Sequence, residues 1–429
     1  MVVTRESKMP LGGSSAFQLM LATSWLAPAH WRDHQDRAIL AALNSGPDWD
    51  EYFALVDWHR TPALSWEALR RTPKATLPAE VSQALQQRST SCQMRAMRLA
   101  SMLIQVLEDF NHAGIPLIPL KGPLLSLEIY GDLAIRHSRD IDIMVALDDM
   151  SRAQACLEKI GWRVYIDEER AGMTQNQEVA GAGGWIVEAW ELSRAFSPRH
   201  TEFLREIGHH TVYWHPVQQC LLELHWRTHR ESPDHTAGQW ARSTALTWHG
   251  FNYRSLSAVD LALHLCEHGN SHCWSRAKWL GDVARIYAAN YVDWSAAFRS
   301  ARALGEENSL LLCLRLLSDL YGLPLPEELA APAGRLPSLF LDRVALSMLN
   351  PAERHPGSAL ATLRMAVSRL YYERWLHRRR SWREIFADLA FCKLDFELLR
   401  LPDRLFWLYI PLRPILWVRR CLSRIAPKA

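Results

Sequence analysis

The sequence predicts an α+β protein in which a small mixed sheet lies between two helical regions. Residues 15–112 carry apolar positions at helical spacing, residues 115–226 alternate short apolar segments with helical ones, and the rest is mainly helical. The chain has 429 residues, of which 48% are hydrophobic and 22% charged. It is therefore long enough for two or three domains and has the composition of a folded protein.

Residues 1–95 form the predicted helical N-terminal region. The clearest helix extends over about residues 78–112 and ends at an Ala-Gly pair. Near the start, Arg5 and Lys8 precede AFQLMLATSWLAPA, which has the charged start and apolar middle of a signal peptide. Polar residues interrupt the apolar run, so the segment fits equally well the apolar side of a first helix.

Short apolar segments predict the strands of the sheet. IPLIPL (115–120) is a buried strand that Lys121-Gly122 closes, and Pro123 suits the first position of the helix that follows. Residues 209–216 resemble the hairpin partner of the last strand. The remaining predicted elements are strands at 139–147, 162–166, 185–192 and 221–226, with a helix over about 148–160.

The segment RDIDIMV places two aspartates inside an otherwise apolar strand. Successive strand side chains alternate faces, so Asp140 and Asp142 share the face opposite Ile141 and Ile143. Two carboxylates so close together repel each other, which predicts a divalent cation between them, and hard oxygen ligands suit Mg²⁺ or Mn²⁺. The alternative is an edge strand whose polar face contacts water.

Neighbouring residues favour the cation. Gly122 lies at a predicted strand-to-helix turn, where backbone N–H groups and the helix dipole can hold a polyphosphate. Lys121 adjoins this turn, and Arg136 and Arg139 stand just before the carboxylates, where they can neutralise phosphate oxygens.

The run LKGPLLSLEIYGDLAIRHSRDIDIMV resembles the signature of the nucleotidyltransferase superfamily with the polymerase-beta-like fold. More narrowly, the chain resembles the bacterial "uncharacterised nucleotidyltransferase" branch, which shows L-K-G, then R-x-x-x-D-I-D, then E-L-H-W. The resemblance covers roughly residues 95–290. It implies a catalytic domain over 96–250 and a helical domain facing the active site over 251–350. Residues 351–429 are predicted separately, from their composition, as a basic, Trp- and Arg-rich helical C-terminal region.

The resemblance also implies roles for single residues. Asp140 and Asp142 would be the catalytic, metal-binding carboxylates, and Glu223 in LLELHW is the best match for the third. Glu188 in WIVEAW is the alternative third ligand. His225 falls on the same strand face as Glu223. The predicted nucleotide-binding residues are Lys121, Gly122, Arg136, Arg139 and Lys278.

The activity implied is metal-dependent transfer of a nucleotidyl group from a nucleoside triphosphate. ATP is the donor that the resemblance favours, and the acceptor is a hydroxyl of a small molecule, peptide or protein, in a bacterial biosynthetic pathway. Lys121-Gly122 stands where Gly-Ser or Gly-Gly is commoner, so Lys121 either reaches phosphate or pairs with a carboxylate. The competing hypothesis is a non-catalytic nucleotide-binding or regulatory protein, such as an antitoxin-like one, on the same fold.

A further segment, ALHLCEHGNSHCWSRAKWLGDVARI, carries His264, His268 and His272 at intervals of four, which allows a zinc site. Gly269-Asn270 is expected to break the helix between the last two of these histidines. Lys278 and Asp282 follow. They are expected either in the wall of the nucleotide or acceptor site or as an exposed i,i+4 ion pair.

The last residues are basic and rich in Trp. From residue 371 onward there are 13 Lys and Arg against 6 Asp and Glu. This pattern predicts a helix that contacts a membrane surface or a partner protein, or else the outer helices of a packed domain. The net charge of +3 indicates no specific nucleic acid. Eight cysteines without a CxxC pair favour free thiols and a cytoplasmic location, and the basic tail adds the alternative of a membrane-peripheral one.

Overall fold

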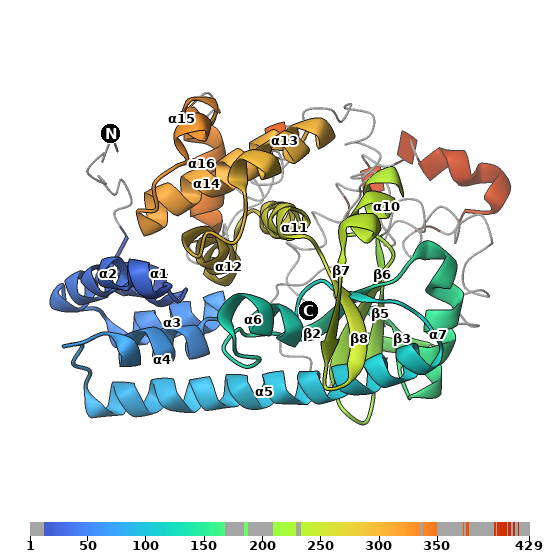
Figure 1. Ribbon diagram of the computed structural model, residues 1–429, viewed down its shortest axis with the longest axis horizontal. Helices are drawn as coiled ribbons and strands as arrows, with labels where there is room; N and C mark the ends of the chain where they lie inside the picture. The colour runs from blue at the N-terminus through green and yellow to red at the C-terminus, as the bar shows by residue number, and fades with distance from the viewer. Residues whose placement is uncertain are drawn as a thin grey trace.

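The computed structural model describes residues 13–167, 184–187, 209–228, 233–334 and 338–349, and scattered positions between 372 and 419. The fold is α+β, as predicted, with a small mixed sheet and many helices (Figure 1). The N-terminal helices are α1 (Ser15–Thr23), η1 (Ala29–Trp31), α2 (Arg32–Asn44), α3 (Trp49–His59), α4 (Pro62–Arg71) and α5 (Ala79–His112). Helix α1 begins at Ser14, whose hydroxyl accepts from Phe17 N, and its Leu19 and Met20 are fully buried.

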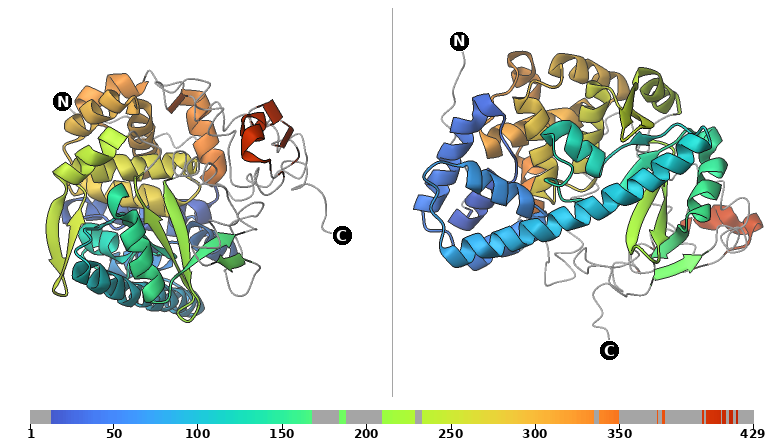
Figure 2. Two further views of the ribbon diagram at one scale, coloured as in Figure 1. Left: turned by 90° about the vertical axis from the view of Figure 1, so that its right-hand side faces the viewer. Right: turned by 60° about the horizontal axis from the view of Figure 1, so that its bottom comes forward.

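Helix α5 connects the two halves of the protein (Figures 1 and 2). Its first half contributes Leu85 and Cys92 to a core shared by the N-terminal helices and the helices after the sheet. Its second half contributes Leu103 and Phe110 to the core under the sheet. The predicted boundary between residues 95 and 96 therefore falls inside one continuous helix.

The six-stranded sheet has the strand order β1-β2-β6-β5-β3-β4. Strands β2 and β6 are parallel, and every other neighbouring pair is antiparallel. The predicted hairpin of residues 209–216 with 221–226 is confirmed as β5–β6. The elements of this part are β1 (Ile118–Pro119), α6 (Pro123–Tyr130), β2 (Asp140–Met144), η2 (Leu147–Asp149), α7 (Met150–Lys159), β3 (Arg163–Asp167), β4 (Gly184–Val187), β5 (His210–His215) and β6 (Cys220–His225).

A second hairpin follows helix α10 (Pro233–Arg242), where only helices and loops were expected. It consists of β7 (Thr244–Trp248) and β8 (Phe251–Ser255) and crosses the predicted boundary at residue 250. Its two turn residues, His249 and Gly250, have φ values of 50° and 83°. Positive φ at both central residues is typical of the tight turns that fit the twist of a hairpin.

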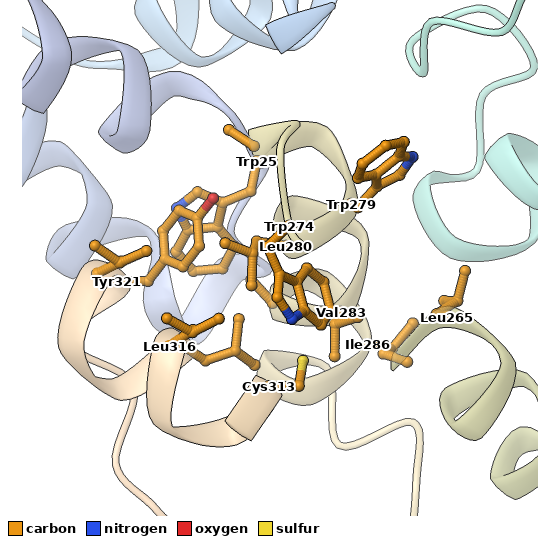
Figure 3. Packing of buried hydrophobic residues seen from close by; sticks show 14 of the residues in the cluster. Trp25, Leu265, Trp274, Trp279, Leu280, Val283, Ile286, Cys313, Leu316 and Tyr321 are labelled. Atoms are coloured by element: carbon orange, nitrogen blue, oxygen red, sulfur yellow. The ribbon is translucent and has the colours of Figure 1, made fainter. Parts of the chain in front are cut away.

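The helices after the hairpin complete the core shared with the N-terminal helices. Figure 3 shows Trp25 from the N-terminal part beside Tyr321 of α14 and Trp274. The hydroxyl oxygens of Ser24 and Tyr321 lie 2.7 Å apart. These helices are α11 (Ala258–Ser271), α12 (Ala277–Ala288), α13 (Trp294–Leu304), α14 (Glu307–Tyr321), α15 (Glu327–Gly334) and α16 (Ser338–Leu349). A 3-10 helix, η3 (Asp403–Leu408), lies in the C-terminal region.

Helix α11 corrects one prediction, because it continues through Gly269-Asn270 to Ser271. A Cβ atom at Gly269 would lie 2.2 Å from the Trp274 ring, so the glycine serves close packing. The side-chain amide of Asn270 is buried, with its Oδ1 accepting from Trp274 Nε1 at 2.7 Å. Gly269-Asn270, a pair that is typical of a helix break, therefore lies within the helix and packs against Trp274.

Most of the basic C-terminal region lies outside the described residues, and so does its predicted membrane or partner contact. Among its described positions, the Tyr372 hydroxyl donates to Asn270 Oδ1 at 3.0 Å and joins this region to α11. In the part of the chain that the structure describes, no helix has both the length and the apolar character to cross a membrane.

Candidate active site

The candidate site lies on one face of strands β2 and β6. Ile141 and Ile143 of β2, and Val145 just after it, lie in the core under α5 and α7. Asp140 and Asp142 therefore face the other side, where Asp142 is buried. The alternation expected from the sequence is present, with Asp142 buried and Asp140 half-buried.

Strand β6 brings a third carboxylate next to Asp142. The parallel register pairs Asp142 with Glu223, and His225 follows on the same face. His225 Nε2 lies 3.4 Å from Asp142 Oδ1 and 3.5 Å from Glu223 Oε2. Ligand atoms of these three residues all lie within 4.8 Å of one another, close enough to hold one metal ion.

Asp140 is not in this closest group, although it belongs to the same electrostatic cluster. Burial raises its pKa, and the carboxylates of Asp142 and Glu223 raise it further. The alternative ligand, Glu188, lies outside the described residues. The strand before it, β4, is at the far edge of the sheet, and three strands separate β4 from β2.

Lys121 enters the cluster from the end of β1. Its Nζ atom lies 2.9 Å from Asp142 Oδ1. Burial acts to lower the pKa of Lys121, but Asp142, Glu223 and Asp140 outweigh it and the pKa is raised. In turn, burial acts to raise the pKa of Asp142, whereas Lys121 and His225 lower it below its usual value.

The Glu223 carboxylate is held in its ionised form. Burial acts to raise its pKa, but His210 and His225, followed by Lys121, hold the pKa well below the usual range. Asp142 and Glu223 therefore offer ionised oxygen ligands in a buried setting, which is the donor set that Mg²⁺ and Mn²⁺ prefer.

The turn at Gly122 lies directly against β2. Gly122 has φ 85° and ψ −153°, a conformation that is essentially restricted to glycine, and it caps helix α6. A Cβ atom here would lie 3.6 Å from Asp140 O. The N-terminal end of α6, whose free backbone N–H groups could bind phosphate, therefore lies beside β2 and its aspartates.

Helix α12 supplies two buried side chains to the loop before β2. Asp282 forms an ion pair with Arg136, with Arg136 Nε 2.8 Å from Asp282 Oδ2, and it also accepts from the Tyr130 hydroxyl at 3.2 Å. Lys278 Nζ donates to His137 O at 3.2 Å. Lys278 and Asp282 therefore do not form an exposed i,i+4 pair. Both side chains are buried, and each contacts a different residue of the loop before β2.

Several cations lie close to that loop, and two of them come from the N-terminal helices. Burial lowers the pKa of His137, and Lys278, Arg60, Arg95 and Arg139 lower it further. Arg60 and Arg95 could not be selected from the sequence, because they lie far along the chain from His137 and only the tertiary fold brings them near it.

Two histidines of helix α11, His264 and His268, lie next to the carboxylate cluster. Lys121 Nζ and His268 Nδ1 are 3.5 Å apart. Burial, followed by Lys121 and His225, lowers the pKa of His264 to about 3. In the described part of the chain, His264, His268 and His272 do not form a group able to hold a metal, and His272 stacks on Trp279.

Comparison with known proteins adds one match to this geometry. A family model described as "Uncharacterised nucleotidyltransferase" matches residues 45–322, from α3 to α14. No curated protein and no solved structure matches the chain. The matched region contains the whole carboxylate cluster, the Gly122 turn and both contributing helices, α11 and α12. The chain therefore belongs to the family of uncharacterised nucleotidyltransferases.

Proposed function

We propose that the protein is a divalent-metal-dependent nucleotidyltransferase. It would move a nucleotidyl group from a nucleoside triphosphate, with ATP as the expected donor, to a hydroxyl of a small molecule, peptide or protein. The observation that carries the proposal is the register of β2 and β6, which sets Asp142 beside Glu223, with Lys121 2.9 Å from Asp142.

The acidic residues fit a divalent ion. Asp140, Asp142 and Glu223 would hold it, because the latter two are buried, ionised and close together. A bound Mg²⁺ or Mn²⁺ would supply charge that neutralises the triphosphate and a template for the attacking and leaving oxygens. Membership of the family supports the same class of reaction.

The residues around the carboxylates suit a triphosphate. The N–H groups at the Gly122 turn would bind phosphate oxygens, and the Lys121 ammonium would exchange its carboxylate partner for a phosphate oxygen. Arg139 adds positive charge near the loop before β2. Burial, followed by Arg136 and Arg60, lowers the pKa of Lys278 well below its usual value, so Lys278 would act chiefly as a hydrogen-bond donor. Arg136 already forms an ion pair with Asp282. It would therefore act by holding the loop before β2 in place and by making the electrostatic potential around the phosphates more positive.

The transfer step moves one nucleotidyl group and one proton. The acceptor oxygen attacks the α-phosphorus, the bond from that phosphorus to the bridging oxygen of the β-phosphate breaks, and pyrophosphate leaves. The third carboxylate, Glu223, would either bind the same ion or accept the proton of the acceptor hydroxyl. Positioning and charge neutralisation would provide most of the acceleration.

The test is incubation with each α-labelled nucleoside triphosphate, Mg²⁺ or Mn²⁺ and cell extract. We expect wild-type protein to label an acceptor, and Asp142→Asn to lose at least about 100-fold of that activity. Asp148→Asn removes an exposed carboxylate just beyond the same strand and should remain active. Labelling that persists undiminished in Asp142→Asn rejects the mechanism. Nucleotide binding without any transfer favours the non-catalytic alternative.

A further inference from the structure

Three histidine rings gather at one end of the β5–β6 hairpin, next to the carboxylates, and only His225 among them belongs to the acidic group described above. The ring centroids of His209 and His210 are 4.4 Å apart, those of His210 and His225 are 4.9 Å apart, and those of His209 and His225 are 5.7 Å apart. One nitrogen from each ring lies within 4.8 Å of the others.

The backbone explains how three adjacent rings share one face. His210 lies directly opposite His225 in the antiparallel register, so these two side chains point the same way. In a regular strand His209 would point to the opposite face. However, His209 precedes β5, with its carbonyl accepting from Trp226 N at 3.1 Å, and its ring contacts the other two.

A carboxylate lies beside two of the three rings. Glu223 Oε2 lies 3.9 Å from His210 Nε2 and 3.5 Å from His225 Nε2. His225 is buried, and among the described residues its Nδ1 has no hydrogen-bond partner. A buried imidazole nitrogen of this kind calls for a ligand or another polar partner.

This donor set differs in kind from the three carboxylates. Imidazole nitrogens suit Zn²⁺, Co²⁺ and related transition metals, whereas Mg²⁺ takes oxygen ligands and usually keeps several waters. Three histidines with one carboxylate make a four-ligand set, and Zn²⁺ needs nitrogens at about 2.0–2.1 Å. Around a tetrahedral ion with such bonds the ligand atoms lie about 3.3 Å from one another, so the three nitrogens, which lie within 4.8 Å of one another, would move closer when the ion binds.

We propose that His209, His210 and His225, with Glu223, bind one transition-metal ion of the zinc class. This site is separate in ligand chemistry from the magnesium or manganese site and needs no nucleotide. It shares Glu223 and His225 with the acidic cluster, whereas His209 and His210 belong to the transition-metal site alone, and Asp140 belongs to the acidic site alone.

The test uses the full chain, stripped with a chelator and titrated with Co²⁺ in the absence of nucleotide. Visible absorption reports the coordination of Co²⁺, and calorimetry with Zn²⁺ gives the stoichiometry. We expect one equivalent of Co²⁺ to give a ligand-field band that Zn²⁺ abolishes. His209→Ala should weaken Zn²⁺ binding at least about 10-fold, as loss of a ligand does. His209→Gln, closer in size, guards against a folding defect, and circular dichroism checks both variants.

Two further variants separate this proposal from the transferase proposal. His30→Ala removes an exposed histidine of η1 and should leave Zn²⁺ affinity unchanged. Asp140→Asn should lose nucleotidyl transfer but keep the Co²⁺ band. The proposal is overturned if wild-type protein shows no saturable Co²⁺ or Zn²⁺ binding, or if folded His209→Ala and His209→Gln bind Zn²⁺ as tightly as wild type. Either result leaves the transferase proposal standing.

Discussion

Lys121 Nζ lies 2.9 Å from Asp142 Oδ1, and both side chains are largely withdrawn from water. The pair joins the end of β1 to the centre of β2 and places a fixed positive charge inside a cluster of three carboxylates. Removing one partner of a buried pair leaves the other charge without compensation, which is more costly than losing an exposed pair.

We therefore expect Lys121→Met to lower the free energy of unfolding by about 3 kcal/mol in wild type. In the Asp142→Asn background the same change should cost at least about 1 kcal/mol less, since the opposing charge is already gone. Chemical denaturation of the four proteins in this cycle measures the coupling. Lys159→Met is the control: this ammonium pairs with Asp109 at 3.6 Å but is 77% exposed. Strict additivity of the two changes would count against a direct interaction.

Glycines at the two ends of α6 provide a matched comparison. Gly131 has φ 74° and ψ 12°, in the left-handed region that Asn tolerates, whereas the ψ of −153° at Gly122 lies outside that region. Gly122→Asn should lower stability by about 1–3 kcal/mol and weaken nucleotide binding, because the turn must shift. Gly131→Asn should cost only a few tenths of a kcal/mol. Equal losses in denaturation and labelled-nucleotide binding would show that the Gly122 conformation is not required.

Much of the site could be predicted because strand alternation is local. The pattern around Asp140 and Asp142 fixes which side chains share a face, and the same holds for Glu223 and His225 on β6. The sequence could not reveal that β2 and β6 are parallel neighbours in register, because several elements, among them α7, β3, β4 and β5, lie between them along the chain. Only the resemblance to a family suggested that Glu223 belongs beside the aspartates.

Other features depended on contacts between distant segments. Arg60 and Arg95 reach the site only because α3 and α5 pack beside the loop that contains His137. The hairpin β7–β8 was missed although His249-Gly250 is a plausible tight turn, since both flanking strands are short and β7 is largely exposed. Whether such a short segment forms a strand depends on the burial of its side chains and on the strand it pairs with, rather than on intrinsic β-propensity.

The buried imidazole of His59 makes stability depend on pH. Burial, followed by the charge of Arg276, lowers its pKa from 6.5 to about 3, and its Nδ1 accepts from Ala277 N at 3.0 Å. Between these two pKa values the unfolded chain binds one more proton than the folded chain at this position. Its contribution to stability is therefore lost as pH falls from about 6.5 towards 3.

We expect His59→Gln, which cannot take up that proton, to show a shallower fall in unfolding free energy between about pH 6 and pH 4. The difference in slope should be about 1.4 kcal/mol per pH unit, the value of one proton. Urea denaturation at several pH values measures it. His30→Gln, which changes an exposed ring, should keep the wild-type slope. Parallel slopes for wild type and His59→Gln would show that His59 does not remain neutral in the fold.

At Gly269 the effects of helix propensity and of side-chain packing on stability have opposite signs. Gly→Ala inside an exposed helix usually stabilises by about 0.5–1 kcal/mol. At Gly269 the added Cβ would lie 2.2 Å from the Trp274 ring, whose Nε1 is already fixed by Asn270. Gly269→Ala should therefore destabilise the protein by about 1–3 kcal/mol, the usual cost of overpacking, and change the near-ultraviolet circular dichroism of the Trp274 environment.

Gly334→Ala is the matched change at the end of α15, where no atom lies within 4 Å of the added carbon. It should be neutral or slightly stabilising. If Gly269→Ala proved as stable as Gly334→Ala, the packing of Trp274 on α11 would have to be abandoned as the reason the helix continues past residue 269.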